Sequence, residues 1–420
     1  MSEWKETSIG SLCTIKHGFA YKGEYITNEK CSNVLVTPGN FTLSGGFKMM
    51  DKPKYYKGPV EKEYILKEGD LIVTMTDLSK GIDTLGYSAL VPKINGITFH
   101  HNQRIGLIEN ISEEVDKGFL YWTMRTKPYQ RFVANSSSGT TVHHTSPNNI
   151  SKYSFLLPTL VEQKEIASIL SSLDDKIAVN RRICENLEAQ AQALFKHWFI
   201  DFAPFKNGKF VESELGMIPE GWRVESIGKL QLIVTDYVAN GSFASLKDNV
   251  KLYQEEEYAY FIRNTDLKSG KFGVYVDKHS YEFLSKSRLY GGEIIISNVG
   301  DVGSVFLCPR LNKPMTLGNN IIMVKSEDAA LNTYLYLLFR CSFGQGLIRS
   351  ITGGSAQPKF NKTDFKSLKI IIPSSTILAN YVDNLLQMIN IIEANKLESS
   401  RLSTLRDTLL PKLMSGQIKV

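Results

Sequence analysis

Trp4-Lys5-Glu6-Thr7-Ser8-Ile9-Gly10 begins a pattern that Trp222-Arg223-Val224-Glu225-Ser226-Ile227-Gly228 begins again, 222 − 4 = 218 residues later in a chain of 420. A second match joins the run from Glu68 to Val73 with the run from Gly291 to Ile296. A sequence that resembles itself at a spacing of about half its length indicates a structural repeat. We therefore expect two copies of one domain design, one after the other.

Each copy is followed by a long segment free of glycine, which begins after Pro158 in the first half and after Pro373 in the second, 373 − 158 = 215 residues later. Mostly apolar residues in the first segment recur at alternating spacings of four and three, which is the heptad pattern of paired helices. They are Ile166, Leu170, Leu173, Ile177, Asn180, Cys184, Leu187, Ala191, Leu194 and Trp198. Adding 215 gives a weaker seam in the same register at Tyr381, Leu385, Met388, Ile392, Asn395, Ser399, Leu402, Arg406, Leu409 and Leu413.

Asn180 and Asn395 occupy the same position in the two seams. A buried asparagine fixes the register of a helix pair, because its amide needs a matching partner. The alternative is that each segment packs only on its own domain, with the asparagine at the edge. The matched asparagines and the length favour a coiled coil, and two similar helices of equal length pair most simply in antiparallel orientation. The predicted interface consists of Leu170, Leu173, Ile177, Asn180, Leu187, Leu194, Leu385, Met388, Ile392, Asn395, Leu402 and Leu409.

The stretches outside these segments contain short runs of Val, Ile, Tyr and Phe, interrupted by Gly, Asn and Pro, which is typical of sheets with a few short helices. Short helical patterns fall at 118–131 and 332–340. The predicted fold is α+β, with two pseudo-symmetric globular domains separated by an antiparallel pair of long coiled-coil helices. Its predicted parts are a domain at 1–158, a central helix at 159–201, a linker with little helix or strand character at 202–221, a second domain at 222–375 and a C-terminal helix at 376–416.

Composition excludes several classes of protein. With 49 basic and 43 acidic residues the net charge is 49 − 43 = +6, and 42% hydrophobic with 22% charged residues is ordinary for a globular chain. No apolar run approaches the roughly 18 residues that span a bilayer, and no export leader opens the sequence, so we expect a cytoplasmic protein without a membrane partner. The five cysteines are scattered and the histidine pairs lack a third ligand nearby, so no metal site is predicted.

Two similar domains held apart by a stiff helix pair suit a partner with two half-sites, and duplex DNA is the obvious candidate. Because the domains differ in their loops, the two half-sites should differ in sequence. The candidate DNA-binding residues combine basic side chains, which neutralise phosphates, with polar ones, which read base edges. They are Lys48, Lys54, Tyr56, Ser79, Lys80, Ser138, Thr140 and His143 in the first domain, and Lys268, Lys286, Arg288, Asn298, Ser355, Gln357 and Lys359 in the second. The alternative for each cluster is an ordinary solvated surface.

Motifs for chemistry on DNA are missing from the sequence. No G-x-x-x-x-G-K-[ST] loop occurs for a motor, and no Asn-Pro-Pro-Tyr or Asp-Pro-Pro-Tyr run occurs for adenine methylation. Glu162-Gln163-Lys164 has the spacing of a nuclease fragment, but no suitably placed aspartate precedes it, so Glu162 is better explained as a carboxylate at a helix N-terminus. We therefore predict no catalytic residues.

Three strings resemble one protein family in combination. They are Leu157-Pro158 followed by Glu162-Gln163-Lys164-Glu165-Ile166, the run Glu214-Leu215-Gly216-Met217-Ile218-Pro219-Glu220-Gly221-Trp222, and the closing run Leu409-Leu410-Pro411-Lys412-Leu413-Met414-Ser415-Gly416. With their half-chain spacing, they make the whole chain resemble the specificity subunit of a type I restriction-modification system.

This resemblance implies a non-catalytic DNA reader, in which each recognition domain binds one half of a bipartite, asymmetric site. It implies helices that set the spacing and dock two methyltransferase subunits, to which motor-nuclease subunits are added. It implies no cofactor in this chain, since S-adenosylmethionine, ATP and Mg²⁺ would belong to those partners. Ile377-Leu378 replaces Glu162-Gln163 in the second half, which predicts unequal methyltransferase contacts. Two rivals stay open, a self-sufficient adenine methyltransferase and a scaffold that binds only proteins.

Overall fold

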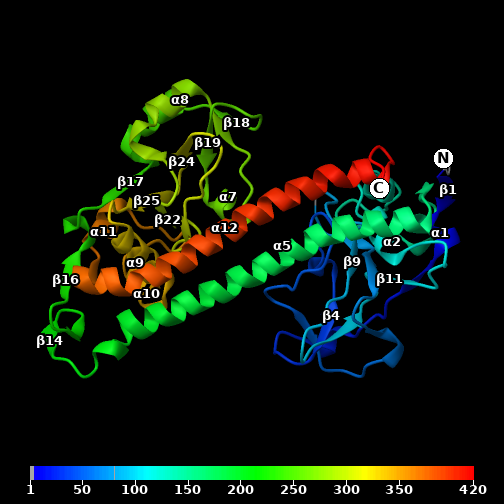
Figure 1. The fold of residues 1–420 in the computed structure, drawn as a ribbon, viewed down its shortest axis with the longest axis horizontal. Helices are drawn as coiled ribbons and strands as arrows, with labels where there is room; N and C mark the ends of the chain where they lie inside the picture. Colours follow the sequence, from blue (N-terminus) through cyan, green and yellow to red (C-terminus); the bar gives the residue numbers. More distant parts are fainter. Residues whose placement is uncertain (1–3, 80) are drawn as a thin grey trace. The chain divides into compact units, whose positions relative to one another are not determined.

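A computed structural model describes residues 4–79 and 81–420 of the chain (Figure 1). These residues form two compact units, unit 1 with Met1–Val179 and Glu398–Val420, and unit 2 with Asn180–Leu397. The long helices α5 (Leu160–Phe195) and α12 (Ser375–Met414) each contribute residues to both units. The predicted fold class, α+β with two repeated domains and long paired helices, is confirmed. The predicted boundaries at 158, 201, 221 and 375 stay predictions, because the compact units divide both helices instead.

Unit 1 contains two principal sheets. The five-stranded sheet has the order β3 (Ile26–Thr27), β5 (Lys54–Tyr56), β4 (Asn33–Val36), β10 (Thr98–His101) and β6 (Ile65–Leu66). The four-stranded sheet has the order β2 (Thr14–His17), β11 (Ile105–Glu109), β7 (Leu71–Thr74) and β9 (Ser88–Leu90). All four residues of β7 are buried, as expected for a continuous apolar run in a central strand.

Unit 2 repeats this topology. Its four-stranded sheet has the order β17 (Ile233–Asp236), β25 (Ile321–Lys325), β22 (Ile294–Ser297) and β23 (Val305–Leu307). Its five-stranded sheet has the order β18 (Leu252–Tyr253), β20 (Tyr275–Val276), β19 (Ala259–Ile262), β24 (Met315–Leu317) and β21 (Arg288–Leu289). In both units one pair in the five-stranded sheet is parallel, β4 with β10 and β19 with β24. The sequence repeat therefore corresponds to a repeat of fold.

In each unit the first and last strands of the repeat pair with each other. β1 (Lys5–Ser8) runs antiparallel to β13 (Ser154–Leu157) in unit 1, and β16 (Arg223–Ser226) runs antiparallel to β26 (Lys369–Ile372) in unit 2. Each closing strand leads within three residues into a long helix, since α5 begins at Leu160 and α12 at Ser375.

Short helices complete each unit. Unit 1 has α1 (Ile9–Leu12), α2 (Lys117–Thr123), α3 (Lys127–Asn135) and α4 (Pro147–Ser151). Unit 2 has α6 (Phe243–Asn249), α7 (Asn264–Ser269), α8 (Lys278–Phe283), α9 (Ala329–Arg340), α10 (Ser342–Ser350) and α11 (Lys362–Ser367). The single helix predicted at 118–131 is wrong, because it is two helices. Thr126 caps α3 through its side chain and Pro128 occupies the first turn, where it is tolerated at a helix start but not inside a helix.

The prediction that residues 202–221 have little strand character is also wrong. β14 (Phe210–Ser213) and β15 (Gly216–Pro219) form an antiparallel hairpin in unit 2. Gly216 has a φ of +97°, which only glycine adopts readily, and it closes a two-residue turn. The rings of Phe202 and Phe205 lie 5.3 and 5.2 Å from that of Trp222, so the segment packs on unit 2.

Within each unit the long helices run antiparallel (Figure 1). In unit 1, Lys176 on α5 pairs with Glu398 at 3.4 Å, and Leu170 lies in one buried cluster with Leu413. In unit 2, the Cys184 thiol donates to the Ile392 carbonyl at 3.6 Å, and the Trp198 ring lies 5.1 Å from that of Tyr381. Trp198 belongs to a π-helical turn, Lys196–Ile200, that follows α5.

The predicted seams face inward. Every seam residue of α5 is buried or half-buried, and on α12 so are Leu385, Met388, Ile392, Asn395, Leu402 and Leu409. Asn180 is completely buried, whereas Asn395 is half-buried and its amide donates to the Ile391 carbonyl at 2.8 Å. Among the described residues, no helix combines the length and apolarity needed to cross a bilayer.

Replacing Leu170, which is 0% exposed, by alanine should lower the free energy of unfolding by about 2–5 kcal/mol, because it removes a side chain from the core of unit 1 and leaves a cavity. Its neighbour Ile169 is 38% exposed, and Ile169→Ala should cost less than about 1 kcal/mol. Urea unfolding of both variants measures the difference. Equal losses would mean that α5 does not present Leu170 to the core.

His101 in β10 predicts a pH dependence of stability. Its side chain is completely buried, its Nε2 lies 2.8 Å from the Ile105 carbonyl, and burial lowers its pKa to about 4. The unfolded chain has a histidine pKa near ~6.5, so stability is full above that pH and is lost as the pH falls toward 4, by about 1.4 kcal/mol per pH unit. Urea unfolding at pH 7 and pH 5 should show a loss about 2 kcal/mol smaller in His101→Phe than in the natural chain. Parallel losses would contradict the assignment.

Candidate nucleic-acid interface

Two polar segments of unit 1 that lie far apart in the sequence meet at a short strand. β8 (Thr76–Asp77) pairs antiparallel with β12 (His143–His144), and His144 exchanges two 2.9 Å backbone hydrogen bonds with Ser138. We call this arrangement of residues 76–79 with 138–144 the first junction. It brings together four of the predicted DNA-binding residues, Ser79, Ser138, Thr140 and His143.

A buried carboxylate holds the first junction in shape. Asp77 is 2% exposed and accepts hydrogen bonds from the amides of Ser79, Thr84 and Leu85 at 2.6, 2.6 and 3.0 Å, and from the Thr84 hydroxyl at 2.8 Å. Burial alone would raise the pKa of Asp77, but these donors outweigh it and the pKa lies below its ordinary value. The carboxylate is therefore charged at neutral pH and shapes the loop. Sequence reasoning missed it, although an aspartate before a short polar loop is a known turn signal.

Unit 2 contains a second junction with the same plan, formed by residues 298–301 and 353–359. Lys359 exchanges backbone hydrogen bonds of 2.8 and 2.9 Å with Gly353 and bridges to Val299. Gly353 and Lys359 correspond to Ser138 and His144 at an offset of 215, and Val299 corresponds to Thr76 at an offset of 299 − 76 = 223. Sequence-distant loops therefore meet in the same way in both units.

A glycine at the same place shapes both junctions. Gly139 and Gly354 have φ values of +101° and +91°, in the region that side chains disfavour. A Cβ atom there would lie 2.0 Å from the Val142 carbonyl oxygen in the first junction and 2.6 Å from the Gln357 carbonyl oxygen in the second. Both loops therefore require glycine for their close backbone approach.

Polar contacts tie three predicted residues of unit 2 to neighbouring loops. Asn298 donates through its amide to the Phe360 carbonyl at 3.1 Å, and the Phe360 amide donates back to the Asn298 carbonyl at 3.1 Å. Lys268 forms a 2.6 Å ion pair with Asp301 at the edge of the junction. Lys286 receives a hydrogen bond at its carbonyl from Thr235, and its side chain is exposed.

The other predicted positions have plain locations. Arg288 is half-buried with its guanidinium 4.7 Å from the centre of the Tyr281 ring, while Ser355, Gln357 and Lys359 are exposed on the second junction. Lys48 and Lys54 are exposed, and Lys54 belongs to the five-stranded sheet rather than to the first junction. Lys80 lies outside the described residues. Whether these side chains contact DNA stays a prediction.

Tyr56 is a correction to the predicted set. It is 2% exposed, and its ring lies 4.8 Å from that of Tyr21 and 6.0 Å from that of Tyr25. A side chain packed in this way cannot be presented to a partner. Alternation in β5 places it on the buried face, opposite to the exposed Lys54.

The duplicated domain, its loop junction and the long helix pair define a class of protein with two recognition domains on one helical frame. The family model described as "Type I restriction modification DNA specificity domain" matches residues 1–189 and 219–401. The chain therefore belongs to the family of type I restriction-modification specificity subunits.

Individual relatives agree with this membership. The chain is 30% identical over 315 residues to the type I restriction enzyme MjaIX specificity subunit of Methanocaldococcus jannaschii, which covers 72% of this chain and 69% of that one. It is 24% identical over 492 aligned positions to the HindI specificity subunit of Haemophilus influenzae, with all of both chains covered. The crystal structure of the type I restriction-modification S subunit from M. genitalium shares the fold with a TM-score of 0.58 and 17% identity, covering 98% of this chain and 96% of that one.

Replacing Asp77 by asparagine should loosen the first junction, because an amide cannot accept four hydrogen bonds and carries no charge. We expect faster hydrogen exchange at the Ser79, Thr84 and Leu85 amides and a loss of about 1–3 kcal/mol of stability. The exposed neighbour Asp83 provides the control, since Asp83→Asn should leave these amides protected. Unchanged exchange in Asp77→Asn would show that the loop does not depend on the carboxylate.

Proposed function

We propose that this chain is the non-catalytic, DNA-reading subunit of a type I restriction-modification complex, and that each unit reads one half of a bipartite, asymmetric site. The observation that carries the proposal is the pair of junctions. Both have the same backbone plan, with a left-handed glycine at equivalent positions, and both present exposed polar side chains. A repeated framework with changed side chains is what reading two different half-sites requires.

The side chains at equivalent junction positions differ in chemistry. At an offset of 215, Thr140 corresponds to Ser355, but Val142 corresponds to Gln357 and His144 to Lys359. Glutamine reads adenine in a bidentate manner and lysine reads guanine or neutralises phosphate, whereas an apolar side chain contacts the thymine methyl group. The second junction therefore suits a different base pattern from the first.

We assign the spacing of the two half-sites to α5 and α12, because each helix belongs to both units. We also assign to these helices the docking of two methyltransferase subunits, to which motor-nuclease subunits add. The Glu162-Gln163 pair contributes less to docking than its exposed setting in sequence suggests, because Gln163 is 1% exposed and bonds to Asp116, Glu114 and Pro158 within unit 1. S-adenosylmethionine, ATP and Mg²⁺ belong to the partner subunits in this proposal, which acts on DNA in the cytoplasm.

The test is a methylation map of DNA treated with the complex of this chain and its methyltransferase subunits. The double variant Gln357→Ala with Lys359→Ala should lose or relax recognition of one half-site only, by about 1–3 kcal/mol per lost base contact. Ser138→Ala with Thr140→Ala should affect the other half-site and leaves the second junction as the internal control. Equal losses at both half-sites would contradict independent reading.

Two further measurements separate the rival functions. Affinity of the complex for its site should fall steeply between 50 and 200 mM salt, because phosphate neutralisation releases counterions. Salt-independent association would favour a scaffold that binds only proteins. Binding of S-adenosylmethionine by the isolated chain would favour a self-sufficient methyltransferase.

A further inference from the structure

Each unit contains an arginine, at the end of a buried helix, that reaches both long helices. Arg125 follows α2 and Arg340 ends α9, and each comes four residues after a tyrosine, Tyr121 or Tyr336. Both tyrosines and both arginines are related by the offset of 215. In each unit the arginine donates to the tyrosine hydroxyl at 2.5 Å, so the guanidinium is oriented by its own helix. We call each arrangement a Tyr-x-x-x-Arg motif.

In unit 1 the motif meets one carboxylate of α5. Arg125 donates through Nη1 to Asp174 at 2.6 Å, and Arg406 of α12 donates through Nη1 to the other oxygen of Asp174 at 2.5 Å. The Arg125 side chain is 2% exposed and that of Arg406 is 11% exposed. Arg406 also pairs with Asp407 at 2.7 Å. A domain helix and both long helices thus share one ion cluster.

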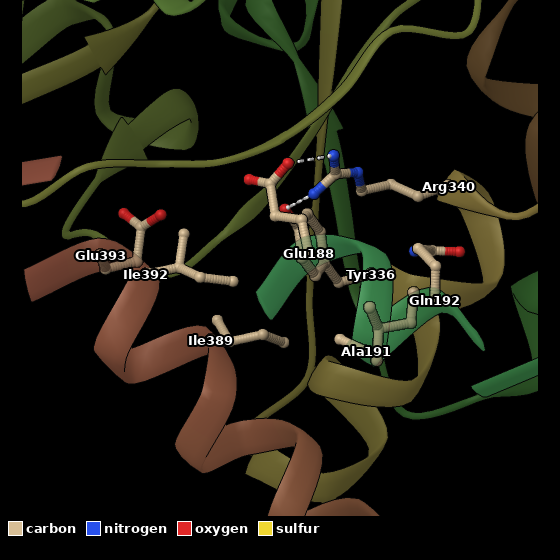
Figure 2. Close-up of a pocket in the computed structure, with 9 residues that line it drawn as sticks. Glu188, Ala191, Gln192, Tyr336, Arg340, Ile389, Ile392 and Glu393 are labelled. Atoms are coloured by element: carbon tan, nitrogen blue, oxygen red, sulfur yellow. Dashed lines mark hydrogen bonds and ion pairs between the residues drawn. The ribbon is translucent and has the colours of Figure 1, made fainter. Parts of the chain in front are cut away.

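In unit 2 the same three elements meet through a different carboxylate. Arg340 and Lys396 of α12 each lie 3.2 Å from an oxygen of Glu188 on α5, and Lys396 also pairs with Glu393 at 3.4 Å. Figure 2 shows the Glu188 carboxylate and the Arg340 guanidinium facing each other beside a cavity of about 10 Å³, room for roughly one water molecule. Burial alone would raise the pKa of Glu188, but Arg340 and Lys396 hold it below its ordinary value.

The sequence repeat extends to the arginines but not to the carboxylates. An offset of 215 from Asp174 leads to Ile389, and the residue 215 positions after Glu188 is Ser403. In both units α5 supplies the shared carboxylate and α12 supplies the second cation. The same three-element contact is therefore reached with unrelated helix positions, which indicates a requirement for the contact itself.

We propose that each Tyr-x-x-x-Arg motif is a positioning device, which clamps its domain to both long helices and fixes the register of the helix pair within its unit. Sliding α12 by one turn would bring Ile392 or Ser400 to Glu188 in place of Lys396, and Leu402 or Leu410 to Asp174 in place of Arg406. Each slide leaves a buried charge with fewer partners, which is strongly unfavourable. An apolar seam alone discriminates less well, since leucine and isoleucine recur at every turn. This inference goes beyond the proposed function and does not rest on DNA binding.

The test uses the full-length chain with spin labels on two exposed positions of unit 2, Ile183→Cys on α5 and Ile391→Cys on α12, and with the half-buried Cys31 replaced by serine. Pulsed dipolar spectroscopy should give one narrow distance in this background. Adding Glu188→Gln should produce a second distance population displaced by one helical turn, about 5.4 Å along the axis, and should lower the melting temperature by more than about 5 °C.

Two matched variants make the result decisive. Glu185→Gln removes an exposed i,i+4 pair with Arg181 on the same helix and should change neither the distance nor the melting temperature. Glu188→Asp retains the charge and should restore the single distance even where stability stays reduced. A lower melting temperature with one unchanged distance in Glu188→Gln would overturn the register role, and so would a second population that also appears in Glu188→Asp.

Discussion

The fold depends on the burial of the apolar faces of α5 and α12, which pack on each other and on a domain at the same time. Leu170 on α5 and Leu385 on α12 are both completely buried, and they belong to different units. An isolated helix of this composition would expose its apolar face, so most of its stability comes from tertiary packing. The closing strands β13 and β26 lead into these helices within three residues, and this short connection ties the course of each domain to its helix.

The features with a long period were the ones that could be predicted from sequence. The half-chain repeat and the heptad spacing extend over many residues, and local exceptions such as Arg406 do not remove the pattern. The features that escaped prediction are short or non-local. The β14–β15 hairpin has four-residue strands set by one glycine, and the break before α3 depends on Thr126 and Pro128. β8 and β12 have two residues each, and their partners lie more than 60 residues apart.

The candidate site illustrates the same limit. Residue type alone selected Ser79, Ser138 and His143, and the structure brings them together, but the same reasoning selected Tyr56, which is buried. Residue type carries no information on the side of a strand unless the neighbouring pattern is read with it. Asp77 was missed because its role is to accept hydrogen bonds from a loop, and the loop closes only when β12 pairs with β8.

The two units show which properties a duplicated domain retains and which it exchanges. Gly139 and Gly354, and the arginines of the two Tyr-x-x-x-Arg motifs, are repeated because they determine backbone course and domain placement. The shared carboxylates are not repeated, since both come from α5. Two identical helices would each have to supply both charges at every contact, and a like-charge approach would then accompany each favourable pair. Dividing the roles, with carboxylates on α5 and the second cations on α12, removes that conflict and makes the two helices complementary rather than equivalent.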